Sequence, residues 1–236
     1  MAHFLAEQKN GDTLVFSSSA AHHIRHVMRL KKGDEFEGVY EGKVYAVQVV
    51  SLDPFEAKII HEILEDRELE GRLTLAFALL KGGHDELILQ KGTELGVYAF
   101  IPFSSERTII RFKNEKEKEA RKARYEKILS SSSEQCRRSF VPECKGIVSL
   151  KELALYPAKT KLFAYEMEAE SGKPIQEAFS DDTLLLIGPE GGFSKEEASY
   201  LLLKGFTAVS LGRRILRAET AAIYGASLYA EHYEKR

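Results

Sequence analysis

Two glycine-containing segments late in the sequence carry residue types that suit a ligand site. The first, IGPEGGFS at 187–194, follows an apolar run and places three glycines and a proline within five residues. The second, LGRRILRAETA at 211–221, combines Gly212 with three arginines and a glutamate. Glycine lets backbone amides and carbonyls approach a ligand closely. The pair therefore predicts a pocket for a flat ligand that is bound largely by main-chain atoms.

The spacing of these glycines excludes two familiar phosphate cradles. A P-loop needs GxxxxGK[ST], and a dinucleotide-binding turn needs GxGxxG after the first strand of its fold. The motif here is Gly-x-x-Gly-Gly after a late strand, which argues against a nicotinamide-dependent oxidoreductase. A tight turn without a ligand is the alternative for 188–192. For the second segment, the alternative is an ion pair between Arg217 and Glu219 that holds the last helix.

Strands alternate with helices from residue 72 onward, and these elements must position the glycine segments. Apolar strands with helices between them predict a parallel α/β sheet covered on both faces. Ligands in such sheets bind beyond the carboxyl ends of the strands, where we expect the two segments to emerge from neighbouring strands. Ser194 and Glu197 predict a capping box for the helix after the first segment. Strands are expected at 73–80, 99–103, 161–165, 184–187 and 206–211, and helices at 85–95, 114–138, 194–204 and 218–233.

The first 70 residues have a different pattern, which predicts a small barrel or a strongly bent sheet. Alternating segments such as DEFEGVY and KVYAVQVVSL indicate short strands. One helix is expected after serines 17–19, with Ile24, Val27, Met28 and Leu30 at helical spacing. The charged stretch EDRELE at 65–70 predicts a linker. We therefore expect one domain at 1–70 and a second at 71–236.

The composition is that of an ordinary globular protein, with 44% hydrophobic and 30% charged residues. No apolar run approaches the roughly 20 residues that span a bilayer. The N-terminus lacks the basic and then apolar segments of a signal peptide, so we expect a cytoplasmic protein. Cys136 and Cys144 are expected to be free thiols. Neither has the spacing of a zinc site, and no metal is expected.

Basic residues cluster in two regions, although the net charge is −2. Residues 20–33 contain four lysines and arginines and no acid. Residues 105–145 contain 12 basic and 7 acidic residues. Such clusters suit a phosphate backbone, and a solvated helix face is the alternative explanation.

The two glycine segments resemble the signature of a known family, the bacterial 16S ribosomal RNA uridine-N3 methyltransferases of the SPOUT class. The resemblance extends over nearly the whole chain, through HHIRHVMRLKKGD at 22–34, KGGHDELILQKGTELGV at 81–97 and EQCRRSFVPE at 134–143. It implies a C-terminal α/β methyltransferase domain tied in a trefoil knot and an N-terminal PUA-like β-barrel that binds RNA. It also implies S-adenosyl-L-methionine as cofactor and a homodimer with active sites at the subunit interface.

The resemblance further implies which residues hold the cofactor. The cofactor would lie bent in three knot loops, the first after the strand at 161–165 and the others formed by the two glycine segments. Main-chain groups would make most of the contacts. The expected contact residues are Tyr165, Glu166, Leu186, Gly188, Pro189, Glu190, Gly191, Gly192, Leu211, Gly212, Ile215, Leu216 and Thr220.

Uracil N3 carries a proton at neutral pH, so its methylation needs a group that stabilises the N3 anion or accepts the proton. Arg138 is the first candidate, with a phosphate contact as its alternative role, and Glu134 would orient it. Arg137 stands where the family usually has glycine, so either arginine is a candidate to face the base. Arg217 would hold RNA or the cofactor carboxylate, and Glu219 would be a base or an ion-pair partner.

The expected substrate is 16S ribosomal RNA or the small ribosomal subunit. A non-catalytic RNA-binding protein with a relict knot domain is the alternative function, but it gives the two glycine segments no role. The residues expected to contact RNA are Arg25, Arg29, Lys31, Lys32, Arg107, Arg111 and Arg213.

Overall fold

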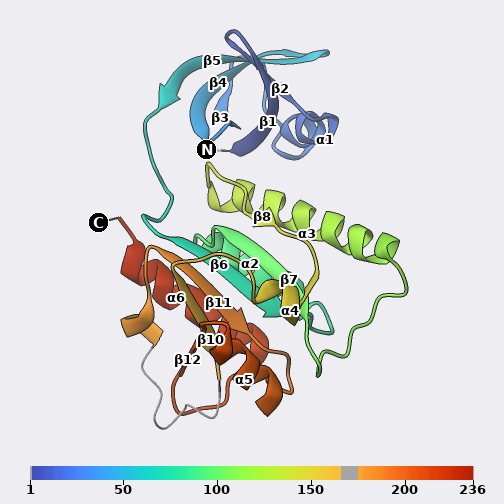
Figure 1. The fold of residues 1–236 in the computed structure, drawn as a ribbon. Coiled ribbons are helices and arrows are strands. Elements are labelled where there is room, and N and C mark those ends of the chain that lie inside the picture. The colour runs from blue at the N-terminus through green and yellow to red at the C-terminus, as the bar shows by residue number, and fades with distance from the viewer. Residues whose placement is uncertain (1, 166–174, 236) are drawn as a thin grey trace. The chain divides into compact units, whose positions relative to one another are not determined.

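The structure is a computed structural model that describes residues 2–165 and 175–235. The chain forms two compact units, whose elements are labelled in Figure 1. The smaller unit runs from the N-terminus to Glu68 and also includes residues 133–141. The larger unit contains residues 69–132 and the chain from Pro142 onward. The end of the long helix and the loop after it therefore belong to the smaller unit.

In the described residues, the smaller unit is a closed barrel of five strands in the order β1-β2-β5-β4-β3. Strands β1 and β3 pair in parallel and close the barrel, while the other pairs are antiparallel. Phe36, Val47 and Ala57 are fully buried in its core, as the alternating segments predict. Its elements are β1 (His3–Asn10), β2 (Thr13–Phe16), α1 (Ser18–His22), the π-helical turn η1 (His23–Val27), β3 (Glu35–Tyr40), β4 (Lys43–Leu52) and β5 (Phe55–Ile63).

The turn after α1 differs from the regular helix that the sequence predicts. Ser17 caps α1 as expected, but from His23 onward the hydrogen bonds span five residues. The amide of Met28 donates to the carbonyl of His23 at 2.9 Å. This wider turn changes which side chains face the core. Ile24 is fully buried, whereas Val27 is 61% exposed and Met28 is 44% exposed, so the predicted apolar stripe is wrong at these two positions.

The larger unit is, over the residues described, a sheet of seven parallel strands in the order β12-β10-β11-β6-β7-β8, with β9 also paired to β7. The parallel α/β architecture predicted from the sequence is confirmed. Its elements are β6 (Arg72–Ala78), α2 (His84–Glu94), β7 (Ala99–Ser104), α3 (Glu115–Cys136), β8 (Glu143–Cys144), β9 (Val148–Ser149), α4 (Leu150–Leu153), β10 (Thr160–Ala164), the 3-10 helix η3 (Ile175–Ala178), β11 (Asp182–Ile187), α5 (Lys195–Leu203), β12 (Thr207–Val209) and α6 (Ala218–Tyr233).

Different helices cover the two faces of this sheet. Leu184 and Leu186 of β11 pack in one core cluster with residues of α4 and α5. Leu185 faces the other way, because successive side chains of a strand alternate between the faces. A Cβ on Gly225 of α6 would lie only 2.7 Å from Leu185, so the glycine lets α6 pack closely on that face. Helix α2 packs beside α6 (Figure 1).

The strand order corrects one expectation about the ligand edge. Strand β10 lies between β11 and β12, with Phe163 in register with Leu186 on one side and with Ala208 on the other. The expectation that the two glycine segments follow neighbouring strands is therefore wrong. Because all three strands are parallel, their carboxyl ends still meet at one edge, where the end of β10 lies between the two glycine segments.

Candidate functional site

A cavity of about 480 Å³ opens at the carboxyl ends of β10, β11 and β12, where Tyr165 and the loops after β11 and β12 line it. Pockets for small ligands commonly occupy roughly 300–1,000 Å³, so the volume suits a ligand of cofactor size. Two of the candidate catalytic residues, Arg217 and Glu219, line it. Among the expected cofactor contacts, the described lining contains Tyr165, Gly188, Pro189, Glu190, Gly192, Leu211, Gly212, Ile215 and Leu216.

The other four expected cofactor contacts are not found in this lining. Leu186 is fully buried in the core between the sheet and α5. The carbonyl of Gly191 accepts a hydrogen bond from Arg107 at 2.6 Å, and Thr220 is exposed on α6. Glu166 lies outside the described residues. A cofactor role for these four stays a prediction.

Local hydrogen bonds fix the shape of the turn after β11. Gly192 adopts a φ of 64°, a conformation that favours glycine, and its amide donates to the carbonyl of Pro189 at 2.8 Å. The hydroxyl of Ser194 accepts from the amide of Glu197, whose carboxylate accepts from the amide of Ser194 at 3.0 Å. The predicted capping box is confirmed, and it anchors the turn to the start of α5.

The loop after β12 combines an open backbone with exposed charge. Gly212 has a φ of 111°, and its amide donates to the hydroxyl of Ser210 at 3.1 Å. Ile215 is 86% exposed at the cavity, and Arg213 and Arg214 are exposed beside it. This side of the cavity therefore presents exposed apolar and basic side chains.

His84 lines the same cavity, although no role was expected for it. It begins α2 directly after Gly83, and its Nδ1 lies 3.3 Å from Oε1 of Glu219 on α6. Among the described residues, the ion pair of Glu219 is with His84, so the alternative of an Arg217–Glu219 pair is wrong. One feature of the sequence points to the position of His84. Gly82 and Gly83 end the predicted strand at 73–80 and place the histidine at the ligand edge of the sheet.

Next to His84, Asp85 anchors the start of α2. Its side chain is fully buried and accepts hydrogen bonds from the hydroxyl of Tyr125 and from Nη2 of Arg121, the latter at 2.6 Å. Burial raises the pKa of Tyr125, and the neighbouring Asp85 carboxylate raises it further. A buried carboxylate with two donors fixes the position of the helix that carries it.

Arg138 and Glu134 belong to the smaller unit and are absent from the described lining of the cavity. Nη2 of Arg138 lies 2.5 Å from Oε2 of Glu68, and the arginine side chain is 5% exposed. Glu134 accepts a hydrogen bond from the amide of Leu5 at 3.1 Å, and burial raises the pKa of its carboxyl group. Both residues therefore hold the segment 133–141 within its unit.

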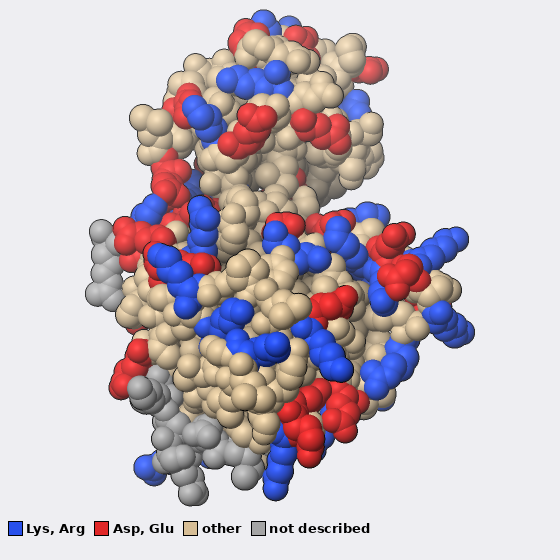
Figure 2. Space-filling view, viewed as in Figure 1, with Lys and Arg blue, Asp and Glu red and all other residues tan. Residues whose placement is uncertain are grey.

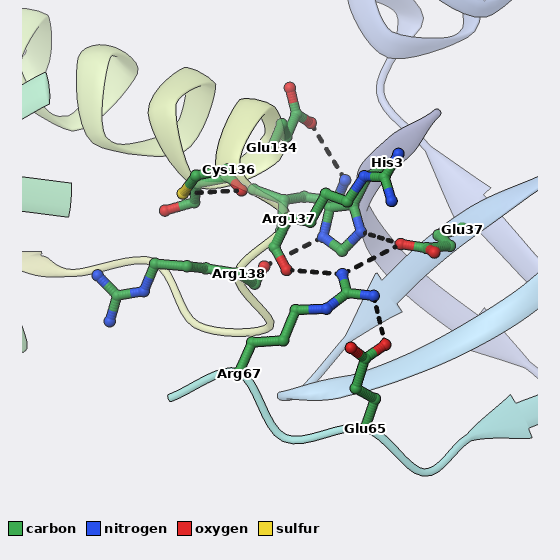
Figure 3. A network of polar contacts seen from close by, with 10 residues as sticks. His3, Glu37, Glu65, Arg67, Glu134, Cys136, Arg137 and Arg138 are labelled. Carbon is green, nitrogen blue, oxygen red and sulfur yellow. Dashed lines mark hydrogen bonds and ion pairs between the residues drawn. The ribbon is translucent and has the colours of Figure 1, made fainter. Parts of the chain in front are cut away.

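A polar network around His3 fastens the same segment (Figure 3). Nδ1 of His3 lies 2.8 Å from the Glu37 carboxylate, and its Nε2 lies 3.1 Å from the carbonyl of Arg138. Arg67 donates to Glu37 and, at 3.1 Å, to the carbonyl of Arg137. Burial raises the pKa of Glu37, but the hydrogen bonds from His3 and Arg67 outweigh it and leave that pKa below its usual value.

Arg137 has a left-handed backbone conformation, with a φ of 61°. A glycine adopts such a conformation without strain, whereas an arginine does not. The Arg137 side chain is exposed, in contrast to the buried Arg138 next to it. Of the two arginines, Arg137 is therefore the one that is accessible.

The basic residues expected to bind RNA are exposed, with one exception. Arg25 is half-buried and donates hydrogen bonds to the carbonyls of Leu52 and Ala21, so it also supports the barrel. On the larger unit, the face seen in Figure 2 carries basic side chains with acidic ones among them. In the described parts of the chain, no helix is long and apolar enough to cross a membrane, and no cluster of three or more His, Cys, Asp or Glu residues suits a metal ion.

Comparisons with known proteins were made on both sequence and structure. Residues 67–230 match the model of a family described as an RNA methyltransferase domain. The chain is 34% identical over 230 residues to ribosomal RNA small subunit methyltransferase E of Bacillus subtilis (strain 168), covering 91% of this chain and 88% of that protein.

Two solved structures resemble the whole chain. One is ribosomal RNA small subunit methyltransferase E from Neisseria gonorrhoeae bound to S-adenosyl methionine, with a TM-score of 0.89 at 28% identity, covering 99% of this chain and 98% of that one. The other is a methyltransferase from Legionella pneumophila in complex with the bound cofactor SAM, with a TM-score of 0.87 at 29% identity, covering 98% and 96%. The predicted fold class, a SPOUT α/β domain with a small N-terminal β-barrel, is confirmed. The chain belongs to the RNA methyltransferase family and groups within it with the ribosomal RNA small subunit methyltransferases E.

Proposed function

We propose that this chain transfers a methyl group from S-adenosyl-L-methionine to N3 of a specific uridine in 16S ribosomal RNA. The observation that carries the proposal is the cavity at the carboxyl edge of the sheet, lined by the end of β10 and by the loops after β11 and β12. The family, the named relatives and the SAM-bound neighbours support the cofactor and the substrate class. The uridine N3 position rests on the resemblance of the glycine segments alone. Because the proposed substrate is ribosomal RNA, we place the reaction in the cytoplasm.

The residues of the cavity fit this cofactor. Gly212 leaves main-chain groups open, and a Cβ at Gly188 would come within 3.1 Å of the Phe193 ring, which also lines the cavity. Leu211 and Leu216 supply apolar surface for an adenine ring. Carboxylates at Glu190 and Glu219 suit a ligand with a positive centre. Tyr165, Gly188, Leu211, Gly212 and Leu216 are the proposed contacts that the cavity supports best.

When bound, S-adenosyl-L-methionine supplies an electrophilic methyl group on a sulfonium. The chain must then position uracil N3 and remove its proton. Arg138 would contact the base only after its ion pair with Glu68 opens, whereas Arg137 is already exposed. We therefore propose Arg137 for contact with RNA, and Arg138 and Glu134 as residues that position the segment around it.

We propose further that the barrel and the basic loops bind RNA and that two copies of the chain assemble into the active form. Exposed basic residues in both units support the first point. The second follows from the resemblance to the family, and large apolar side chains exposed on the larger unit are ones that a second copy would cover. They include Ile215 at the cavity, Tyr224 on α6, and Ile109. Light scattering on the purified protein tests the dimer.

The function is tested with purified protein and small-subunit RNA from cells that lack it. The RNA is incubated with methyl-labelled S-adenosyl-L-methionine, digested, and analysed by mass spectrometry of the nucleosides. We expect label in N3-methyluridine, at about one per RNA molecule. Label in another nucleoside contradicts the proposed position. RNA binding without any methyl transfer supports the alternative of a relict RNA-binding protein.

A further inference from the structure

His84 and Glu219 form a carboxylate–imidazole pair in the cavity wall. Nδ1 of His84 lies 3.3 Å from Oε1 of Glu219. The glutamate side chain is 13% exposed and the histidine side chain 44% exposed. The carboxylate is therefore shielded, while the imidazole keeps contact with the open side of the cavity.

The position of His84 in the fold separates it from the loops proposed to hold the cofactor. Those loops follow β10, β11 and β12, whereas His84 follows β6, which lies on the other side of β11. In the described lining, His84 is the imidazole that borders the cavity from this side. A uracil base that approaches the methyl donor from this side of the cavity would meet the imidazole of His84, which can accept a proton.

The two ring nitrogens of His84 have different surroundings. Nδ1 is the ring nitrogen that lies beside the Glu219 carboxylate, at 3.3 Å, so Nε2 is the nitrogen left to meet a substrate. No hydrogen-bond partner of Nε2 is found among the described residues, and a Cβ on Gly82 would lie 3.6 Å from it. The glycine therefore keeps this edge of the ring uncovered.

Neighbouring contacts fix the two helices that carry His84 and Glu219. Asp85, the next residue, is buried and bound to Arg121 and Tyr125, which anchors the first turn of α2. Helix α6, which carries Glu219, packs beside α2. The other ionisable side chains of the described cavity wall are Tyr165, Glu190, Arg214 and Arg217.

We propose that His84 is the general base of the reaction and that Glu219 positions it, an inference that rests on the proposed methylation of uridine N3. The proton of uracil N3 passes to Nε2 of His84 as the N3–H bond breaks. The electron pair of N3 forms the new bond to the methyl carbon, and the electrons of the sulfur–methyl bond stay on sulfur. The positive charge thus moves from the sulfonium to the imidazolium, where the Glu219 carboxylate stabilises it.

The test compares His84→Gln with the wild type and with His232→Gln, a control at the far end of α6, outside the described cavity lining. Single-turnover methyl transfer is measured on RNA made with uridine and on RNA made with 5-fluorouridine, whose N3 proton is more acidic. Affinity for S-adenosyl-L-methionine is measured by calorimetry. We expect His84→Gln to slow transfer to uridine by about 10²-fold or more, the usual contribution of a general base, with unchanged cofactor affinity. The loss should shrink at least tenfold on fluorouridine RNA. Glu219→Gln should show the same pattern with a smaller loss.

Three results overturn the proposal. They are a wild-type rate in His84→Gln, a loss of rate that fluorouridine does not relieve, and a parallel loss of cofactor affinity. In each of these cases the wild type still forms N3-methyluridine, so the proposed function stands. If the wild type forms no N3-methyluridine, the proposed function fails, and the role of His84 fails with it.

Discussion

Nη1 of Arg107 donates a hydrogen bond to the carbonyl oxygen of Gly191 over 2.6 Å. The bond ties the loop after β7 to the glycine turn after β11. A Cβ on Gly191 would lie 3.4 Å from Cδ of Arg107, so the aliphatic part of the arginine side chain also lies against the turn. Arg107 therefore supports this turn, and the RNA contact expected for it stays a prediction.

Arg107→Ala should therefore weaken the binding of S-adenosyl-L-methionine by about threefold to tenfold. A charge-assisted hydrogen bond at an exposed site contributes on the order of 1 kcal/mol to the placement of the turn. Calorimetry measures the effect, with Arg111→Ala as the control, since Arg111 is exposed and donates only long bonds of 3.4 Å to nearby carbonyls. Unchanged cofactor affinity together with a loss of RNA binding would contradict this role and support the RNA contact that the sequence predicts for Arg107.

Arg137→Gly should stabilise the protein by about 1 kcal/mol. A left-handed conformation costs a non-glycine residue roughly 1–2 kcal/mol, and the greater freedom of glycine in the unfolded chain offsets part of the gain. The measurement is urea denaturation of the wild type and the variant. The same variant should weaken RNA binding, because it removes the exposed guanidinium. If the variant is less stable than the wild type, the left-handed backbone of Arg137 does not strain the fold.

Glu37 should make the stability depend on pH in the acid range. Its pKa in the folded state lies below the usual value of 4.5, so the ionised group stabilises the fold above that pH. This stabilisation is lost as the pH falls through the lowered pKa of the folded state. Glu37→Gln should be less stable than the wild type near neutral pH, and the difference should narrow below about pH 4.5. Urea denaturation at several pH values measures it, and a constant difference would show that the charge of Glu37 is not involved.

Lys32→Ala should weaken RNA binding without loss of stability, because the lysine is exposed. Loss of one phosphate contact reduces the slope of log affinity against log salt by about 1. Arg25→Ala should instead lower both stability and RNA binding, because Arg25 also donates to the carbonyl of Leu52 at 3.0 Å. RNA titrations at several salt concentrations and thermal unfolding separate the two effects. An unchanged salt slope in Lys32→Ala excludes a phosphate contact there.

Local features of the site could be predicted from the sequence because they depend on neighbouring residues. The capping box of Ser194 and Glu197 and the bounds of α6 follow from residue types three or four positions apart. Gly188 and Gly212 predict an open backbone, and both line the cavity. The barrel was predictable for the same reason, since alternating burial has a period of two residues.

Features that depend on tertiary arrangement could not be predicted. The position of β10 between β11 and β12 is set by crossover connections, which leave no periodic signal in the sequence. The stretch at 65–70 was expected to be a linker, yet Arg67 and Glu68 pair with residues far along the chain. The pairing of His84 with Glu219 joins residues 135 positions apart, and no motif connects them.

The most direct test of the central claim is calorimetric titration of the purified protein with S-adenosyl-L-methionine. The wild type should bind one molecule per cavity, and NADH should give no binding. In Gly212→Val, where a branched side chain meets a φ of 111°, affinity should fall at least tenfold. Absence of binding to the wild type, or undiminished affinity in Gly212→Val, would contradict the claim that these loops hold the methyl donor.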